Sequence, residues 1–544
     1  MELPDEKYQP LPREAYQALE DIVGADNITE EPAILDSYAF QRNSELIGRP
    51  GRFMFRPAAA ILPGNTEEVQ AIVKTCNRYH LKYKAYSTGW SSYSVPSSEG
   101  VLQIDLRRMD RILEIDEQNM FAVVEPYVTG AQLQAEAMKV GLNCHMIGAG
   151  CSCAPLASAT SFLGNGPDTI SMGGGTETML GLEWVMPTGD VLRTGSLGSG
   201  AGWFCGEGPG PSVRGVCRGF VGACGGMGVY TKVALRLHPW PGPAVMPVEG
   251  EVPAYSSPLP DNIRAHTLAF PTWQAYADAY TKITDAEIGY ILHRQFNFFG
   301  EDLQVAMVKI ISDSTKQLDD MEELLETPEI QKLTQEMKRS FQIVLAGNSR
   351  RDIEYQEKAL DQILAETSGR KVAAMEDPAT ERYVLLYLIR LCFKNLNFAY
   401  AGGYQTCFTH KGPPNFCISY VPYAENILKE HQQTGLLVDT GADSMMGGSS
   451  FTGGGGVAWF EQFMFWDPHV KESRQQARKL NQASAAFSRE HKWPGTYEGV
   501  IGTREEKQTN LMASNQPEIY RWQRKIKEAF DPNDTSDGAY AYLT

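Results

Sequence analysis

The chain has 544 residues, 42% of them hydrophobic and 21% charged, so it can build sizeable cores in two to four domains. Its 49 lysines and arginines are outnumbered by 66 aspartates and glutamates, which gives a formal charge of −17. This balance disfavours nucleic acid and anionic membranes as partners, because both require a basic patch.

The first 17 residues are polar and acidic, with neither a basic start nor an apolar run. No stretch reaches the ~18 apolar residues of a membrane span. These features predict a cytoplasmic protein whose ten cysteines are reduced. The cysteine spacing contains no pair of CxxC motifs, so no metal site is expected.

In chain order, residues 11–45 read as two helices joined by a turn, and residues 56–64 as a short strand ended by Pro-Gly. A helix with Thr66 as its N-cap follows over 66–80. Strands are expected at 82–90, 101–106 and 121–128, and a helix at 129–141. This order predicts an α+β domain with a mixed sheet.

Residues 146–230 are rich in small residues, and within them 180–195 have the pattern of a β-hairpin. An alternating strand over 228–242 closes the region. Residues 242–470 mix helices such as 315–326 with apolar strands such as 457–467, which predicts a separate domain. Two amphipathic helices, 468–491 and 517–530, and a turn-rich tail complete the chain.

Three segments carry chemistry. The strand at 82–86 runs into a turn of small, hydroxyl-bearing residues (85–94), whose backbone N–H groups suit a pyrophosphate. The Gly-rich runs 148–176 and 222–232 let backbone approach a planar ligand closely. Each segment also has a plainer interpretation, as a polar turn or a surface loop. The sequence lacks a P-loop, an HExxH zinc motif, a GxGxxG between strand and helix, and a GxSxG elbow.

In their order, the segments RPAAAILPGNTEEVQAIV, STGWSSYS, AVVEPYVTGAQL, SFLGNG, LGLEWVMPTGDVLRTG and GGMGVYTKVALRLHP resemble flavoproteins of the vanillyl-alcohol oxidase and p-cresol methylhydroxylase superfamily. The similarity covers residues 15–240 and returns in C-terminal segments that look most like the para-phenol-oxidising branch.

The resemblance implies an α+β fold with a two-lobed FAD-binding domain at 1–240. A cap domain with an antiparallel sheet is expected at 241–470, and a C-terminal return to the FAD site at 471–544. The residues that it implies at FAD are Ser87, Thr88, Gly89, Trp90, Ser91, Ser92, Pro155, Ser161, Gly164, Asn165, Gly225, Gly226, Gly228 and Val229.

Departures from the family's pattern are informative. The pyrophosphate turn has no His for covalent attachment, and the equivalent cap stretch offers Trp459 and Phe460, so FAD is expected to be bound non-covalently. The phenolate clamp of the branch, two Tyr and an Arg, aligns with Trp90, Tyr497 and Glu498, and a carboxylate would repel a phenolate.

Tyr497, Glu498 and Trp90 are nevertheless the catalytic candidates, as a substrate-facing hydroxyl, a base or cation-binding group, and a hydrophobic wall. Core packing or a solvated surface position is the competing interpretation of each. His410 is a further candidate base or a structural His. Cys151 and Cys153 either tune the flavin site or fill space.

The resemblance implies an FAD-dependent oxidoreductase that transfers a hydride to flavin from a C–H next to oxygen or an aromatic ring. The alternatives are a 2-hydroxy-acid dehydrogenase of the lactate or glycolate type, and an FAD-carrying electron-transfer or scaffold subunit. Expected partners are a small aromatic or hydroxylated substrate, an electron-acceptor protein and further copies of the chain, as a homodimer or larger assembly.

Overall fold

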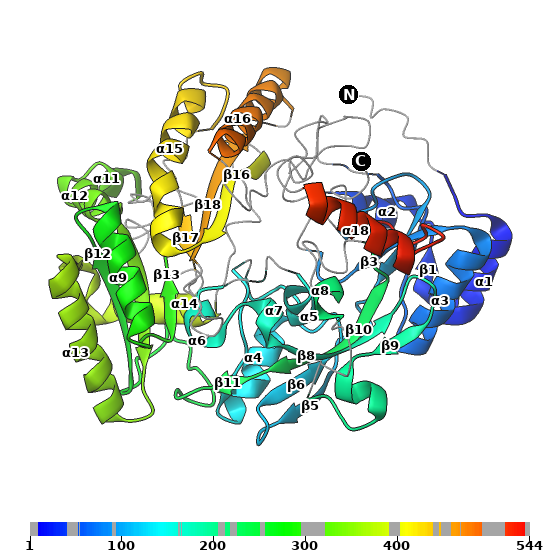
Figure 1. Ribbon diagram of the computed structural model, residues 1–544, viewed down its shortest axis with the longest axis horizontal. Coiled ribbons are helices and arrows are strands. Elements are labelled where there is room, and N and C mark those ends of the chain that lie inside the picture. Colours follow the sequence, from blue (N-terminus) through cyan, green and yellow to red (C-terminus); the bar gives the residue numbers. More distant parts are fainter. Residues whose placement is uncertain are drawn as a thin grey trace.

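The computed structural model describes residues 9–40, 53, 55–89, 94–148, 150–161, 164, 166–204, 213–217, 226–250, 256–294, 321–390, 403–438, 445–447, 458–467, 469–491 and 517–538. Three sheets of four or more strands, beside one of two strands, organise these residues into an N-terminal half with two lobes and a third unit, called the cap below. Figure 1 shows the N-terminal half on the right and the cap on the left. Among these residues, no helix combines the length and the apolar character that crossing a membrane requires.

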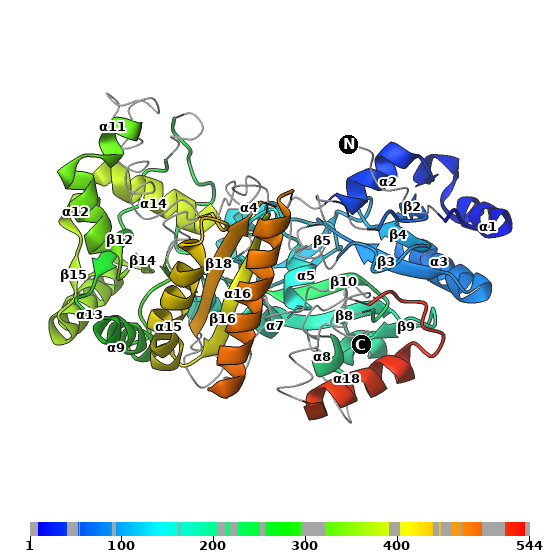
Figure 2. The ribbon, with the colours of Figure 1, turned by 90° about the horizontal axis from the view of Figure 1, so that it is seen from above.

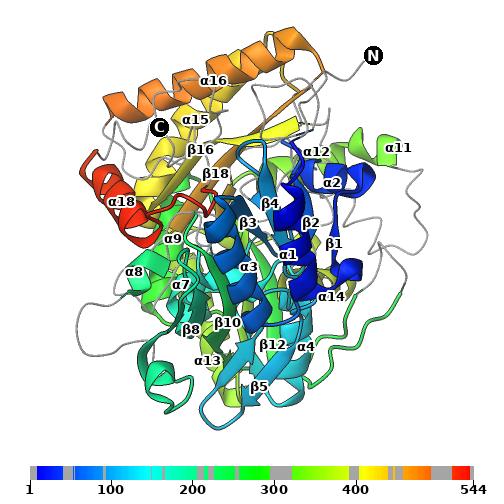
Figure 3. The same cartoon turned by 90° about the vertical axis from the view of Figure 1, so that its right-hand side faces the viewer.

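The first lobe is a four-stranded sheet in the order β1-β2-β4-β3, with β2, β4 and β3 parallel and β1 antiparallel to β2. Helices α1 and α3 pack together on it, and their apolar stripes join one buried cluster with the strands (Figure 3). Its elements are α1 (Arg13–Val23), η1 (Ala25–Asn27), β1 (Ile28–Thr29), α2 (Pro32–Ala39), β2 (Ala59–Ile61), α3 (Thr66–Tyr79), β3 (Lys82–Tyr86) and β4 (Val101–Asp105).

The start of α3 corrects one expectation. Asn65, not Thr66, is the N-cap, because the Asn65 side chain accepts a hydrogen bond from the amide of Glu68. Thr66 instead donates its hydroxyl to Glu183 in the second lobe, at 2.7 Å. The strand β1 was also missed, because two residues give no periodic pattern.

The second lobe is an antiparallel five-stranded sheet in the order β5-β6-β10-β8-β9. The expected hairpin is confirmed as β8 and β9, whereas β5 was not expected as a strand of its own. The strands and helices of this region are β5 (Ile112–Asp116), β6 (Phe121–Val124), α4 (Gly130–Lys139), β7 (Leu142–Asn143), α5 (Pro155–Ala159), α6 (Thr169–Met172), α7 (Gly175–Thr178), β8 (Met179–Val185), β9 (Val191–Arg193), η3 (Gly195–Ser199), α8 (Arg214–Cys217), β10 (Val229–Arg236) and β11 (His238–Pro239).

The cap is a seven-stranded antiparallel sheet in the order β15-β12-β14-β13-β17-β18-β16, as expected for an α+β cap. Its elements are β12 (Ile263–Ala269), α9 (Trp273–Asp285), β13 (Ile291–His293), α11 (Met321–Leu325), α12 (Pro328–Met337), β14 (Ser340–Ala346), α13 (Arg350–Thr367), β15 (Arg370–Lys371), η6 (Ala373–Met375), α14 (Pro378–Arg390), β16 (Gly403–Gly412), α15 (Pro414–Gln432), β17 (Met445–Gly447), β18 (Ala458–Trp466) and α16 (Lys471–Glu490).

Helix α16 lies along the β16–β18 end of the cap sheet (Figure 2). Its buried residues Ala477 and Leu480 belong to the same core as Leu268, Phe341 and Trp466 of the cap strands. The last described helix, α18 (Pro517–Phe530), packs instead on the second lobe, where Phe530 stacks on Trp184 with ring centroids 5.5 Å apart.

We therefore expect Leu480→Ala to lower the free energy of unfolding of the cap by ~2–5 kcal/mol, because it opens a cavity in that core. Lys479→Ala, on the exposed face of the same helix, should change it by less than about 0.5 kcal/mol. Urea titrations followed by circular dichroism measure both variants. Equal midpoints would contradict the assignment of α16 to the cap core.

Candidate functional site

The turn after β3 is the first candidate segment. Ser87 donates its hydroxyl to the carbonyl of Pro126 at 2.5 Å, which ties the turn to the segment after β6. Gly89 has φ +68°, and a Cβ there would lie 1.9 Å from the Tyr86 hydroxyl, so only glycine fits. Thr88 is half-buried between them. The predicted residues Trp90, Ser91 and Ser92 lie outside the described residues.

The second segment is the Gly-rich run around α5 and α7. A Cβ on Gly164 would lie 2.4 Å from the carbonyl oxygen of Ser158, and one on Gly175 would lie 2.5 Å from the Ser158 hydroxyl. The backbone layers are therefore too close for any side chain. Pro155 is buried at the first position of α5, and the carbonyl of Ser161 accepts the amide of Gly164. Asn165 lies outside the described residues.

A buried His–Asp pair lies beneath this run, and sequence reasoning missed it. His145 Nδ1 lies 2.6 Å from Asp168 Oδ1, and His145 Nε2 lies 2.9 Å from the Gly164 carbonyl oxygen. Burial opposes the charged form of His145, but the Asp168 carboxylate outweighs it and raises the pKa of His145 above its ordinary value. A lone His in LNCHMIG carries no local signal of this pairing.

The third segment meets the chain's C-terminal region. Gly226 and Gly228 have φ +75° and +83°, and their amide-rich turn leads into the fully buried Val229. A Cβ on Gly226 would lie 2.7 Å from the Ser536 carbonyl oxygen. The Gly228 amide donates to the Ser536 hydroxyl at 3.0 Å. Gly225 lies outside the described residues.

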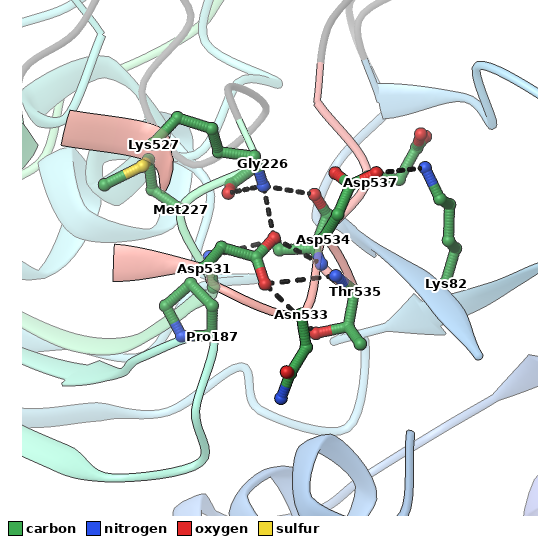
Figure 4. Close-up of polar contacts among 12 residues, drawn as sticks. Lys82, Pro187, Gly226, Met227, Lys527, Asp531, Asn533, Asp534, Thr535 and Asp537 are labelled. Carbon is green, nitrogen blue, oxygen red and sulfur yellow. Dashed lines mark hydrogen bonds and ion pairs between the residues drawn. The ribbon is translucent and has the colours of Figure 1, made fainter. Parts of the chain in front are cut away.

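Lys527 on α18 holds this contact together (Figure 4). Its ammonium donates to the carbonyls of Gly226 and Ser536 at 2.6 and 2.7 Å, and to the Asp531 carboxylate. Burial lowers the pKa of Lys527, against the raising effect of Asp531. Asp531 in turn accepts the amides of Thr535 and Ser536.

Residues 535–537 then join the first lobe. Tyr83 of β3 exchanges backbone hydrogen bonds with Thr535 and Asp537, so the segment adds a parallel bridge to the β3 edge. The carboxylate of Asp537 lies 3.4 Å from the Lys84 ammonium and accepts the Ser97 amide, and each side chain of the ion pair is 1% exposed. The C-terminal segment 531–538 thus links the turn after β3 to the glycines before β10.

These residues fit FAD. The turn after β3 offers hydroxyls and a left-handed glycine, and the described glycines of the run, Gly164 and Gly175, bring backbone close to backbone. The Ser158 hydroxyl is buried beside Gly164 and has no hydrogen-bond partner within the described parts of the chain, which leaves a donor and an acceptor for a ligand.

The catalytic candidates Tyr497 and Glu498 lie outside the described residues, as does Trp90, and all three roles stay predictions. His410 lies on β16, where the strand register places it directly opposite Phe460 of β18. Cys153 is buried, which raises the pKa of its thiol to about 12 and keeps it protonated, whereas Cys151 is half-buried.

Comparison with known proteins identifies an FAD-binding domain in the chain. Residues 57–195 match the family model of an FAD binding domain. An uncharacterised FAD-linked oxidoreductase of Mycobacterium tuberculosis is 29% identical over 226 residues, which are 40% of this chain and 44% of the relative. The flavoprotein subunit of 4-cresol dehydrogenase (hydroxylating) from Pseudomonas putida is 28% identical over 43% of this chain and 44% of the relative. The chain therefore matches less than half the length of these curated relatives.

The fold similarity is more extensive. The crystal structure of p-cresol methylhydroxylase with substrate bound covers 97% of this chain and 96% of its own, with a TM-score of 0.70 and 18% sequence identity. The α+β fold expected for the chain is thereby confirmed over the N-terminal half and the cap together.

The buried Lys84–Asp537 pair makes a prediction about stability. Asp537→Asn removes the carboxylate that lies 3.4 Å from the Lys84 ammonium, and should cost about 3 kcal/mol or more of unfolding free energy. Asp534→Asn, which breaks the exposed pair with Lys82, should cost at most about 1 kcal/mol. Urea unfolding of both variants is the measurement, and an equal small loss would contradict a structural role for the buried pair.

Proposed function

The chain contains an FAD-binding domain and has the fold of the vanillyl-alcohol oxidase and p-cresol methylhydroxylase superfamily, and from this premise we propose that it is an FAD-dependent oxidoreductase. Its substrate would be a small aromatic or hydroxylated molecule with a C–H next to oxygen or to an aromatic ring. FAD, when bound, supplies the chemistry by accepting a hydride from that carbon.

One observation carries the proposal: residues that match an FAD-binding model are also those that the structure assembles into a glycine- and hydroxyl-lined site. In this proposal Ser87 and Gly89 would bind the pyrophosphate, and Gly164 would lie beside the flavin; all three fall within the matched residues 57–195. The C-terminal segment 531–538 fixes the turn relative to Gly226 and Gly228. The protein's part is to orient the cofactor and to exclude water from it.

On the substrate side, we propose Tyr497 as the hydroxyl that orients the substrate and Trp90 as a hydrophobic wall. Glu498 would take a proton from a substrate hydroxyl or bind a cationic group. A carboxylate at this position would repel a phenolate. We therefore expect the substrate to be an alcohol or an amine rather than a simple phenol. His410 is the second candidate base.

Two other functions follow from the same residues. A 2-hydroxy-acid dehydrogenase needs cationic groups for the substrate carboxylate, and an FAD-carrying electron-transfer or scaffold subunit needs no substrate clamp. Trp90 and Glu498 differ from the residues that bind the phenolate in the phenol-oxidising branch. This difference favours the scaffold role as the second candidate. A cytoplasmic location, an acceptor protein and a homodimer or larger assembly stay predictions.

The test of the function is an anaerobic titration of the purified holoenzyme, followed at the flavin band. The donors are 4-alkylphenols, aromatic alcohols, 2-hydroxy acids and cationic amines. We expect aromatic alcohols or amines to bleach the flavin, and admission of oxygen then separates an oxidase from a dehydrogenase. Bleaching by 2-hydroxy acids alone would support the hydroxy-acid alternative. No bleaching by any donor would support the scaffold role.

We also propose that FAD is held without a covalent bond. Acid precipitation should leave a colourless pellet and release all the flavin into the supernatant. A yellow pellet would contradict the proposal. His410→Gln would then identify the attachment, because His410 pairs with Phe460 on the strand where a bonding residue is expected. His469→Gln, at an exposed position after β18, is the matched control.

A further inference from the structure

His145 is a histidine that the proposed reaction does not use, although it lies directly beneath the Gly-rich run. It is 7% exposed and follows β7. Its two ring nitrogens lie 2.6 Å from Asp168 Oδ1 and 2.9 Å from the Gly164 carbonyl oxygen. The second carboxylate oxygen of Asp168 accepts the Met146 amide at 2.6 Å.

This geometry favours two protons on the ring. A carbonyl oxygen can only accept, so Nε2 must carry a hydrogen toward Gly164. The Asp168 carboxylate already accepts the Met146 amide and lies at charge-assisted distance from Nδ1, so Nδ1 also donates. Both ring nitrogens of His145 therefore face acceptors, an arrangement that favours the imidazolium.

Three titratable groups near His145 are uncharged. His238 on β11 is kept neutral, since burial lowers its pKa to about 4. Burial also keeps the Cys144 thiol and the Tyr290 hydroxyl protonated, by raising their pKa values. Glu177 of α7 adds a further favourable negative charge, and the cations Arg236 and Arg390 act on His238 and Cys144 respectively.

Two glycines of the run, Gly164 and Gly166, lie close to His145. The Gly164 carbonyl oxygen accepts hydrogen bonds from both the His145 ring and the Gly175 amide. A Cβ on Gly166 would lie 1.8 Å from the Met146 carbonyl oxygen and 3.1 Å from His145 Cε1. A shift of this backbone would break the His145 hydrogen bond or clash with residue 146.

We propose that His145 is a positioning residue: its imidazolium, oriented by Asp168, holds the backbone at Gly164 and at Gly166 in the shape that binds FAD. The inference rests on the proposed placement of the flavin at this run. It adds that FAD affinity depends on the His145 proton. Because the pairing favours the protonated form, the contribution is complete below the ordinary pKa of histidine, about 6.5, and is lost as pH rises through the raised value.

The test measures equilibrium FAD binding to apoprotein by flavin fluorescence from pH 6 to 9. In the wild type, affinity should fall as pH rises. In His145→Gln the affinity for FAD should be about tenfold weaker at pH 6.5 and nearly independent of pH. The reason is that a neutral amide replaces a charged ring that donates two hydrogen bonds. In Asp168→Asn the fall should occur at a pH at least about one unit lower, because the carboxylate that holds the proton is gone.

His431→Gln is the matched control, since His431 lies on α15 of the cap and its Nδ1 accepts from Gln476, a contact that glutamine can reproduce. It should retain the wild-type profile. Melting temperatures of the apoproteins separate the proposal from a general loss of stability. A lowered melting temperature with unchanged affinity and pH profile would overturn it, as would a wild-type profile in His145→Gln. The readout needs no turnover, so a donor panel that fails to bleach the flavin counts only against the proposed reaction.

Discussion

The structure of the N-terminal half depends on charges that are buried with their partners at the chain's C-terminal region. Lys84 and Asp537 each expose 1% of their side chains, and an ion pair withdrawn from water to this extent is tolerated only when both partners are present. Lys527 is held more completely still, because its three N–H donors match three acceptors on Gly226, Ser536 and Asp531. Together these contacts anchor a segment more than 440 residues from β3 along the chain.

That anchor determines the backbone of the candidate site. Ser536 binds the turn of Gly226 and Gly228, and Asp537 binds Lys84 on β3. A shift of one lobe relative to the other would therefore separate the Lys84–Asp537 ion pair and leave a buried charge without its partner. The glycines at this point are required by the protein's own packing, because a Cβ on Gly226 would collide with Ser536 and Gly538. The same holds for Gly164 and Gly175, whose missing side chains admit Ser158.

Local patterns in the sequence were sufficient where the determinants were local. The alternation of 180–195 predicted the β8–β9 hairpin, and the apolar stripe of 66–80 predicted α3, although Asn65 proved to be its cap. They were insufficient where a partner is remote. The tail DPNDTSDG reads as a turn, and nothing in it shows that Asp537 meets Lys84. His145 and Asp168, 23 residues apart, are paired by the folding of the run between them. The resemblance supplied the two-lobed plan, and the predicted residues that the structure describes lie in its three candidate segments.

If packing explains the glycines, recognition of FAD must come chiefly from backbone groups and small hydroxyls, with few side chains that a substitution could alter. A site of this kind tolerates wide divergence in sequence while it keeps its shape. The comparisons agree with such a divergence. The sequence matches to the M. tuberculosis and P. putida relatives cover 40% and 43% of this chain, whereas the fold of p-cresol methylhydroxylase covers 97% of it at 18% identity. The antiparallel sheet of the cap likewise requires alternation and not particular side chains. Changes in the cap can therefore occur without disturbing the buried charges that hold the two lobes of the N-terminal half together.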